Sequence, residues 1–233
     1  MNPTPEIRDD LPRPSRILSF LSPGATGTIL CALSALFYSL ASICLRHMSD
    51  LSYDKAFQIA IKETVTVLFV APWLIQRIAR RKSLGTTWKL LGIMLFASVL
   101  TQLVGNMGQI HSLSTVGLTR TIPTIFAVML IAGAVFGRMF LHERISLRSI
   151  VAIGILIASI LLLQQTAKAE TVTVSNLYSQ GLGAAALCGF TYAILAVSIR
   201  YVSKAGMHPG IVMIVTTGVG TICLGGLGGY RTG

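Results

Sequence analysis

The chain has 233 residues, of which 53% are hydrophobic and only 12% are charged, and its formal net charge is +11. Soluble domains carry about 25% charged residues, so this composition excludes an ordinary soluble protein and indicates an integral membrane protein. The basic residues stand at the ends of apolar runs and not on one amphipathic face, so we expect a lipid bilayer, and no nucleic acid, as their partner.

The first 25 residues have the composition of a polar tail. They contain the acidic residues Glu6, Asp9 and Asp10 and several prolines before any long apolar run. A secretory signal needs a basic start followed by an apolar core of about 7–15 residues, and this pattern is not present. We therefore expect residues 1–25 to form a cytoplasmic tail that leads into the first spanning helix.

Seven apolar segments follow the tail, and none has the two-residue alternation of a half-buried strand. In lipid, only helices and closed barrels satisfy all of their own backbone hydrogen bonds. The sequence therefore predicts an all-α, polytopic bundle of about seven membrane-spanning helices, with neighbours antiparallel because the connections are short. The segments cover approximately residues 27–45, 56–75, 90–107, 118–136, 150–163, 181–199 and 210–228.

Basic residues indicate the orientation of the chain. Most of the 19 Lys and Arg residues stand in the tail and in the second, fourth and sixth connections, which lie on one side of the membrane. Cytoplasmic loops carry the excess of Lys and Arg, so we expect a cytoplasmic N-terminus in a multi-pass protein of the cell (inner) membrane.

The sixth apolar segment repeats features of the first. Gly27, Ala32, Leu33, Tyr38, Arg46 and Ser49 align without gaps on Gly181, Ala186, Leu187, Tyr192, Arg200 and Ser203. The repeat unit in this alignment therefore holds five segments, and because this number is odd, the second copy enters the membrane from the opposite side. Such inverted repeats are typical of secondary transporters, whose substrate sites lie between the halves.

The repeat predicts two domains, a first five-helix repeat at residues 26–166 and an incomplete second repeat at 181–233. The second copy has room for two helices. We expect a truncated reading frame or a split gene rather than a seven-helix product, and a homodimer or a complementing chain could rebuild a ten-helix unit.

A polar stripe marks the third segment. Ser98, Gln102, Asn106 and Gln109 are spaced by four, four and three residues, which places them on one helical face. We expect the segment to end near residue 107 and a short turn to follow at residues 112–117. In hydrocarbon the polar face either lines a cavity for a substrate or hydrogen-bonds another helix, and both interpretations stay open.

Charged residues also occur within the spans. Lys62 and Glu63 lie in the second segment and Arg120 near the start of the fourth. Charges in a span are costly, so Lys62 and Arg120 are candidates for the substrate pathway. The alternatives are a structural ion pair or a side chain that reaches the interface. Pro123 deprives an earlier carbonyl of its partner and predicts a broken or kinked helix start.

Two further patterns concern packing and the repeat. Tyr38 and Tyr192 occupy matching positions in the two copies, so both either face a shared cavity or fill the bundle core. Gly133 and Gly137 form a GxxxG step that permits a close helix contact.

Three stretches follow one another in the middle of the chain: residues 117–126 with Pro123, the corner at 140–146 with Glu143 and Arg144, and the apolar run at 150–163. In these stretches the sequence resembles the EamA-type branch of the drug/metabolite transporter superfamily. The resemblance implies a duplicated five-helix repeat, a structural role for the Glu-Arg corner, and transport of small metabolites, with export the commoner direction.

The expected function is secondary transport of small metabolites by alternating access between inverted repeats. No P-loop, zinc-protease motif or nucleophile elbow is present, so we expect neither an enzyme nor ATP-driven transport. The histidines and cysteines lack metal-ligand spacing, and we expect no metal and no cofactor. The alternative is a non-transporting membrane fragment or a helix bundle that binds a partner.

Overall fold

The computed structural model describes residues 23–51, 54–79, 85–142, 147–166 and 175–232. The chain divides into two compact units, Met1–Ile43 and Cys44–Gly233, and the following description treats each unit by itself. Glu143 and Arg144, expected to form a structural corner, lie outside the described residues.

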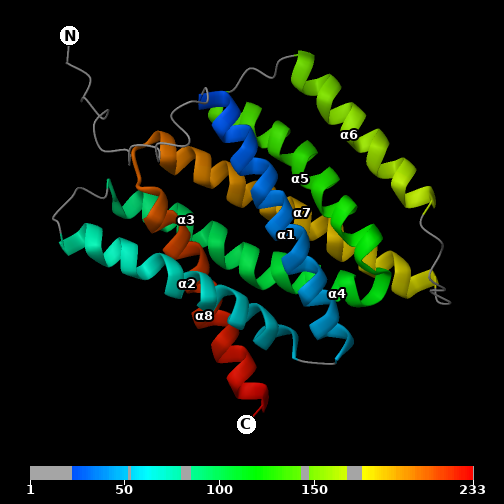
Figure 1. The fold of residues 1–233 in the computed structure, drawn as a ribbon, viewed down its shortest axis with the longest axis horizontal. Helices are drawn as coiled ribbons and strands as arrows, with labels where there is room; N and C mark the ends of the chain where they lie inside the picture. Colours follow the sequence, from blue (N-terminus) through cyan, green and yellow to red (C-terminus); the bar gives the residue numbers. More distant parts are fainter. Residues whose placement is uncertain (1–22, 52–53, 80–84, 143–146, 167–174, 233) are drawn as a thin grey trace. The chain divides into compact units, whose positions relative to one another are not determined.

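All elements of the described chain are helical (Figure 1). They are α1 (Pro23–Asp50), α2 (Lys55–Ala79), α3 (Trp88–Leu100), η2 (Thr101–Asn106), α4 (Met107–Val116), α5 (Leu118–Leu141), α6 (Leu147–Thr166), α7 (Ser175–Lys204) and α8 (Pro209–Thr232). Because α3, η2 and α4 follow one another without a break, the seven predicted segments correspond to seven continuous helices. The prediction of an all-α bundle is confirmed.

Length and apolarity support a membrane protein. Six helices are long and apolar enough to cross a membrane, and α6 contributes the shorter apolar stretch Ile150–Ser159. Large apolar side chains remain exposed along these helices, including Phe69, which is 80% exposed, and Ile222, which is 76% exposed. Exposed apolar surface of this extent is what lipid contact requires. The chain is thus an integral multi-pass membrane protein.

The third spanning helix is longer than its apolar pattern suggests. We expected its end near residue 107 and a turn at 112–117, but the helix continues to Val116, and Gly117 alone turns the chain with φ at 82°. The polar side chains of this last part have partners: the Thr115 hydroxyl donates to the His111 carbonyl within the helix, and the Ser112 hydroxyl bonds that of Thr121 in α5 at 2.8 Å. Polar composition therefore did not mark a helix end here.

We expected Pro123 to break or kink the start of its helix, but helix α5 is not broken there. It runs without interruption from Leu118 to Leu141, with Pro123 in its second turn. The Thr121 N–H already bonds the Gly117 carbonyl, so Pro123 lies just beyond the N–H groups that have no partner. It removes a single hydrogen bond, the one to the Thr119 carbonyl, and the helix continues through it.

Within the second unit, the principal contacts join helices that are distant in the sequence. Helix α2 packs along α8, and α7 packs along both α5 and α4, while α3 contacts α7 and α8 (Figure 1). Three small apolar clusters fill these contacts, centred on Ile59 and Leu224, on Met94 and Val202, and on Ile125 and Ala185. The core of the unit is thus built around α7 and α8.

A glycine allows α7 to approach α5 closely. A Cβ atom on Gly189 would lie 2.5 Å from the Ile125 carbonyl oxygen, a distance that real side chains do not adopt. We expected the GxxxG step of α5 to make a close helix contact. Gly137 is buried, but a Cβ atom on Gly133 would meet nothing within 4 Å, so Gly133 makes no such contact within the described residues. The close approach of α7 to the α5 backbone at Ile125 therefore depends on Gly189.

Candidate functional site

The middle of the third spanning helix is a π-helical turn that carries buried polar residues. In η2, Thr101, Gln102 and Asn106 are buried, and Ser98 before it and Gln109 after it are buried as well. A π turn accommodates an extra residue relative to the α-helix, and such turns occur frequently at functional sites. All four residues of the predicted stripe are thus in the interior of the second unit.

Tyr192 of α7 connects two members of the stripe. Its hydroxyl lies 2.6 Å from Asn106 Oδ1 and 2.8 Å from Gln109 Oε1. A hydroxyl has one proton, so Tyr192 donates fully to only one of these two acceptors at a time.

The hydrogen bonds continue from Asn106 to α8. Asn106 Nδ2 donates to Gln102 Oε1, and Gln102 Nε2 donates to the Thr216 carbonyl oxygen at 3.0 Å. Ser98 Oγ also reaches Thr216, through the hydroxyl at 3.3 Å. These hydrogen bonds join the third spanning helix, α7 and α8. We call the residues that make them the polar network: Ser98, Gln102, Asn106, Gln109, Tyr192 and Thr216.

An ion pair from α2 adjoins the network. Lys62 Nζ lies 3.1 Å from Glu63 Oε1, with the Glu63 side chain 8% exposed and that of Lys62 35% exposed. A Cβ atom on Gly220 of α8 would lie 2.7 Å from both Glu63 Cγ and Gln102 Cδ. Glu63 and Gln102 therefore both pack onto Gly220, which places the carboxylate side chain beside the stripe.

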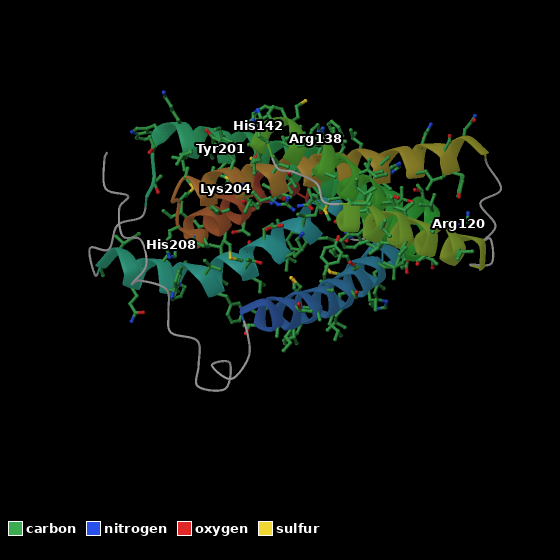
Figure 2. The ribbon with its side chains drawn as sticks, turned by 90° about the horizontal axis from the view of Figure 1, so that it is seen from above. Arg120, Arg138, His142, Tyr201, Lys204 and His208 are labelled. Carbon is green, nitrogen blue, oxygen red and sulfur yellow. The ribbon has the colours of Figure 1, made fainter. Side chains whose placement is uncertain are left out.

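The two remaining candidates are Arg120 and Tyr38. Arg120 places its guanidinium 5.1 Å from the centre of the Tyr178 ring, a cation–π contact. Figure 2 shows Arg120 at the opposite end of the helices from Arg138 and Lys204. Tyr38 belongs to the first unit, where its carbonyl accepts a hydrogen bond from Ser42, so its pairing with Tyr192 stays a prediction.

Comparison with known proteins identifies the family. The model of the EamA-like transporter family matches residues 25–164, more than half of the chain. The chain belongs to the EamA-like transporter family. No curated protein and no solved structure matches it.

Family membership confirms the resemblance found in the sequence. The EamA-like chain is a membrane transporter of the drug/metabolite transporter type, and the family is one of transporters rather than enzymes. Among the residues that the structure describes, no group of three or more His, Cys, Asp or Glu side chains could hold a metal ion.

Sequence reasoning missed the α8 side of the site in this EamA-like protein. Thr216 and Gly220 lie in an apolar helix and carry no charge. Placing them in a membrane span costs little free energy, so the charge-based argument that singled out Lys62 and Arg120 did not apply to them. A signal was nevertheless available, because the alignment that places Tyr38 on Tyr192 also places Lys62 on Thr216. Extending the repeat alignment by one helix would have brought α8 into the candidate site.

Proposed function

We propose that this EamA-like protein is a secondary transporter that exports a small polar metabolite, with the polar network as part of the substrate pathway. Alternating access between inverted repeats moves the substrate. The observation that carries the proposal is the position of the network: donors and acceptors from three helices meet at a buried π turn inside a membrane protein.

The chemistry of the network suits a polar, uncharged or zwitterionic substrate. Side-chain amides offer both N–H donors and C=O acceptors, so Gln102, Asn106 and Gln109 can exchange partners with a substrate without leaving a buried group unpaired. The single proton of the Tyr192 hydroxyl is shared between Asn106 Oδ1 and Gln109 Oε1. Whichever of these two oxygens does not receive it can accept a hydrogen bond from a substrate. Arg120, at one end of α5, is a candidate contact for a substrate carboxylate on the way to the network.

The contact between α2 and α8 supports the inverted repeat. The two helices run antiparallel: Trp73 late in α2 lies against Gly210 early in α8, and Ala60 early in α2 lies against Gly225 late in α8. The repeat alignment makes α2 and α8 equivalent, and equivalent helices of inverted repeats have opposite directions. They pack along each other as two helices on either side of a pseudo-two-fold axis would.

The Lys62–Glu63 pair is a candidate for coupling. A carboxylate buried in a span is expensive unless it is paired, and Glu63 is both paired with Lys62 and packed beside Gln102. Because Glu63 and Gln102 both pack onto Gly220, a movement of the Lys62–Glu63 pair would change the packing of Gln102 in the substrate pathway. Coupling to a gradient rather than to ATP is part of the proposal.

The remaining features of the proposal concern placement. The chain lies in the cell (inner) membrane with residues 1–25 in the cytoplasm, as its basic connections favour. Residues 26–166 form a first repeat and residues 181–233 belong to a second. Tyr38 is a further candidate for the pathway, and the transporter acts as a homodimer or with a complementing chain.

The proposal is tested by release of metabolites from bacterial cells that produce the protein. Mass spectrometry of the medium should show a small polar metabolite enriched by the wild type, with the enrichment lost in Gln102→Leu and Asn106→Leu at equal membrane levels. Phe69→Leu, a change at an exposed apolar position, is the control and should retain release. Release retained by both network variants would refute the site, and no release by the wild type would refute transport by this chain alone.

The hydrogen bonds also support a second function for the network, as an attachment between helices of a non-transporting bundle. All of its members find partners within the described protein. This alternative predicts that Gln102→Leu lowers thermal stability and that the wild type has no release to lose, whereas a substrate pathway predicts that release is lost from variant protein that remains folded in the membrane. Comparison of the two readouts in one variant separates the two functions.

A further inference from the structure

An apolar pocket lies between α3, α5 and α7, apart from the polar network. Its volume is about 460 Å³, and its walls include Ile93 and Phe96 of α3, Phe136 and Phe140 of α5, and Ile194 and Tyr201 of α7. Phe96 is 68% exposed and Phe140 is 61% exposed, so the pocket opens at the surface of the second unit. Because the flanking surface is apolar and belongs to helices long enough to span a membrane, we expect the opening to face the bilayer.

Basic side chains stand at one end of this pocket. Arg138 precedes the wall residue Phe140 by two positions, His142 follows the wall residue Leu141, and Lys204 lies one turn beyond Tyr201. Figure 2 shows Arg138, His142, Tyr201 and Lys204 together at the same end of the helices. Helices α5 and α7 both end here, at Leu141 and Lys204. We expect the ends of spanning helices to lie near the membrane–water interface.

The described carboxylates lie elsewhere. Asp54 caps the start of α2 through the N–H groups of Ala56 and Phe57, and Asp50 pairs with Arg46, which also donates to the Leu113 carbonyl. Both stand at the other end of the helices, and Glu63 is within the span. Glu143 follows His142 in the sequence and lies outside the described residues. The described rim of the pocket is therefore cationic.

We propose that this pocket binds an anionic phospholipid. One acyl chain lies between Phe96, Phe136 and Ile194, and the phosphate is held by Arg138 and Lys204, with the Tyr201 hydroxyl as a further donor. An apolar groove that ends in basic residues at the interface matches a phospholipid, whose chain is apolar and whose charge lies at headgroup depth. Basic pockets between helices bind anionic headgroups in this way. The volume lies within the roughly 300–1,000 Å³ range of small-molecule sites.

The test is lipid binding to the purified full-length chain, measured by native mass spectrometry with phosphatidylglycerol and phosphatidylcholine. We expect the wild type to retain phosphatidylglycerol in preference. The double variant R138Q/K204Q should lose that preference, by about five-fold for each basic residue removed. R120Q, which removes a cation at the other end of the helices, is the matched control and should keep the preference. Equal retention of both lipids by the wild type would overturn the proposal.

A second measurement locates the lipid on the wild type and therefore does not depend on the folding of R138Q/K204Q. Phosphatidylglycerol with a photoreactive group in the acyl chain should label peptides of α3, α5 and α7 at the pocket, and I194W should reduce that labelling by filling the cavity. Uniform labelling of all lipid-facing helices would contradict the proposal. Cross-links between two protein chains at the pocket would also contradict it, because they would assign the groove to a second copy.

Discussion

The Tyr192 hydroxyl of α7 lies 2.6 Å from Asn106 Oδ1 in the π turn of the third spanning helix. This contact joins two elements that are far apart in the sequence, and it stands at the centre of the polar network. The same hydroxyl is 2.8 Å from Gln109 Oε1, so one proton serves two acceptors.

Tyr192→Phe is expected to lower stability and transport together. It removes the donor to Asn106 and Gln109 while keeping the aromatic ring. Interhelical hydrogen bonds in membrane proteins contribute about 0.6 kcal/mol on average and up to roughly 1.7 kcal/mol, so we expect a loss of about 1 kcal/mol. Unfolding of the detergent-solubilised protein measures it, with Tyr178→Phe as the control. An unchanged stability would show that the bond contributes nothing to the fold.

Gly220→Ala is expected to displace side chains of the polar network while helix α8 itself remains helical. The new Cβ would lie 2.7 Å from Gln102 Cδ and from Glu63 Cγ, so both side chains must move. Overpacking of this kind costs about 1–3 kcal/mol, and we expect metabolite release to fall sharply. The matched control is Gly218→Ala, because a Cβ there meets nothing within 4 Å. Equal behaviour of the two variants would mean that Gly220 does not position the network.

Gly189→Ala is expected to force α7 away from α5. Its Cβ would approach the backbone oxygen of Ile125 at 2.5 Å, and a backbone atom yields less readily than a side chain. We expect a destabilisation of roughly 1–3 kcal/mol, measured by unfolding in detergent. Gly133→Ala, at a position with open space around it, should be close to neutral. A larger loss of stability for Gly133→Ala than for Gly189→Ala would contradict this prediction and would show that the close contact of α5 is at its GxxxG step.

Lys62→Met is expected to destabilise the protein more than the double change Lys62→Met with Glu63→Gln. The single change leaves the buried Glu63 carboxylate without its cation, whereas the double change removes the charge as well. The Lys62 side chain is 35% exposed, so we expect a difference of only about 1–3 kcal/mol, in the range for a lost partner of a charged group. A double variant no more stable than the single one would show that the pair is not coupled energetically.

Part of the site could be predicted from the sequence. The spacing of Ser98, Gln102, Asn106 and Gln109 placed them on one face, and the structure buries all four. The partners of that face could not be predicted, because Thr216 and Gly220 of α8 are ordinary residues for a membrane helix. The π turn was also not predicted, since it depends on how the third helix packs against α7 and α8 rather than on its own apolar pattern.

The sequence by itself determined that this protein is a bundle of membrane-spanning helices of the EamA-like type. The physical reason is that lipid offers no hydrogen bonds, so an apolar segment of sufficient length must become a helix whatever its neighbours are. Only the tertiary structure decided which helices meet, because lipid-facing and protein-facing apolar surfaces have the same composition. Small residues at particular positions then allow particular helices to pack closely. Gly189 lies against the Ile125 backbone, and Gly220 lies against Gln102 and Glu63, and these contacts hold the site together.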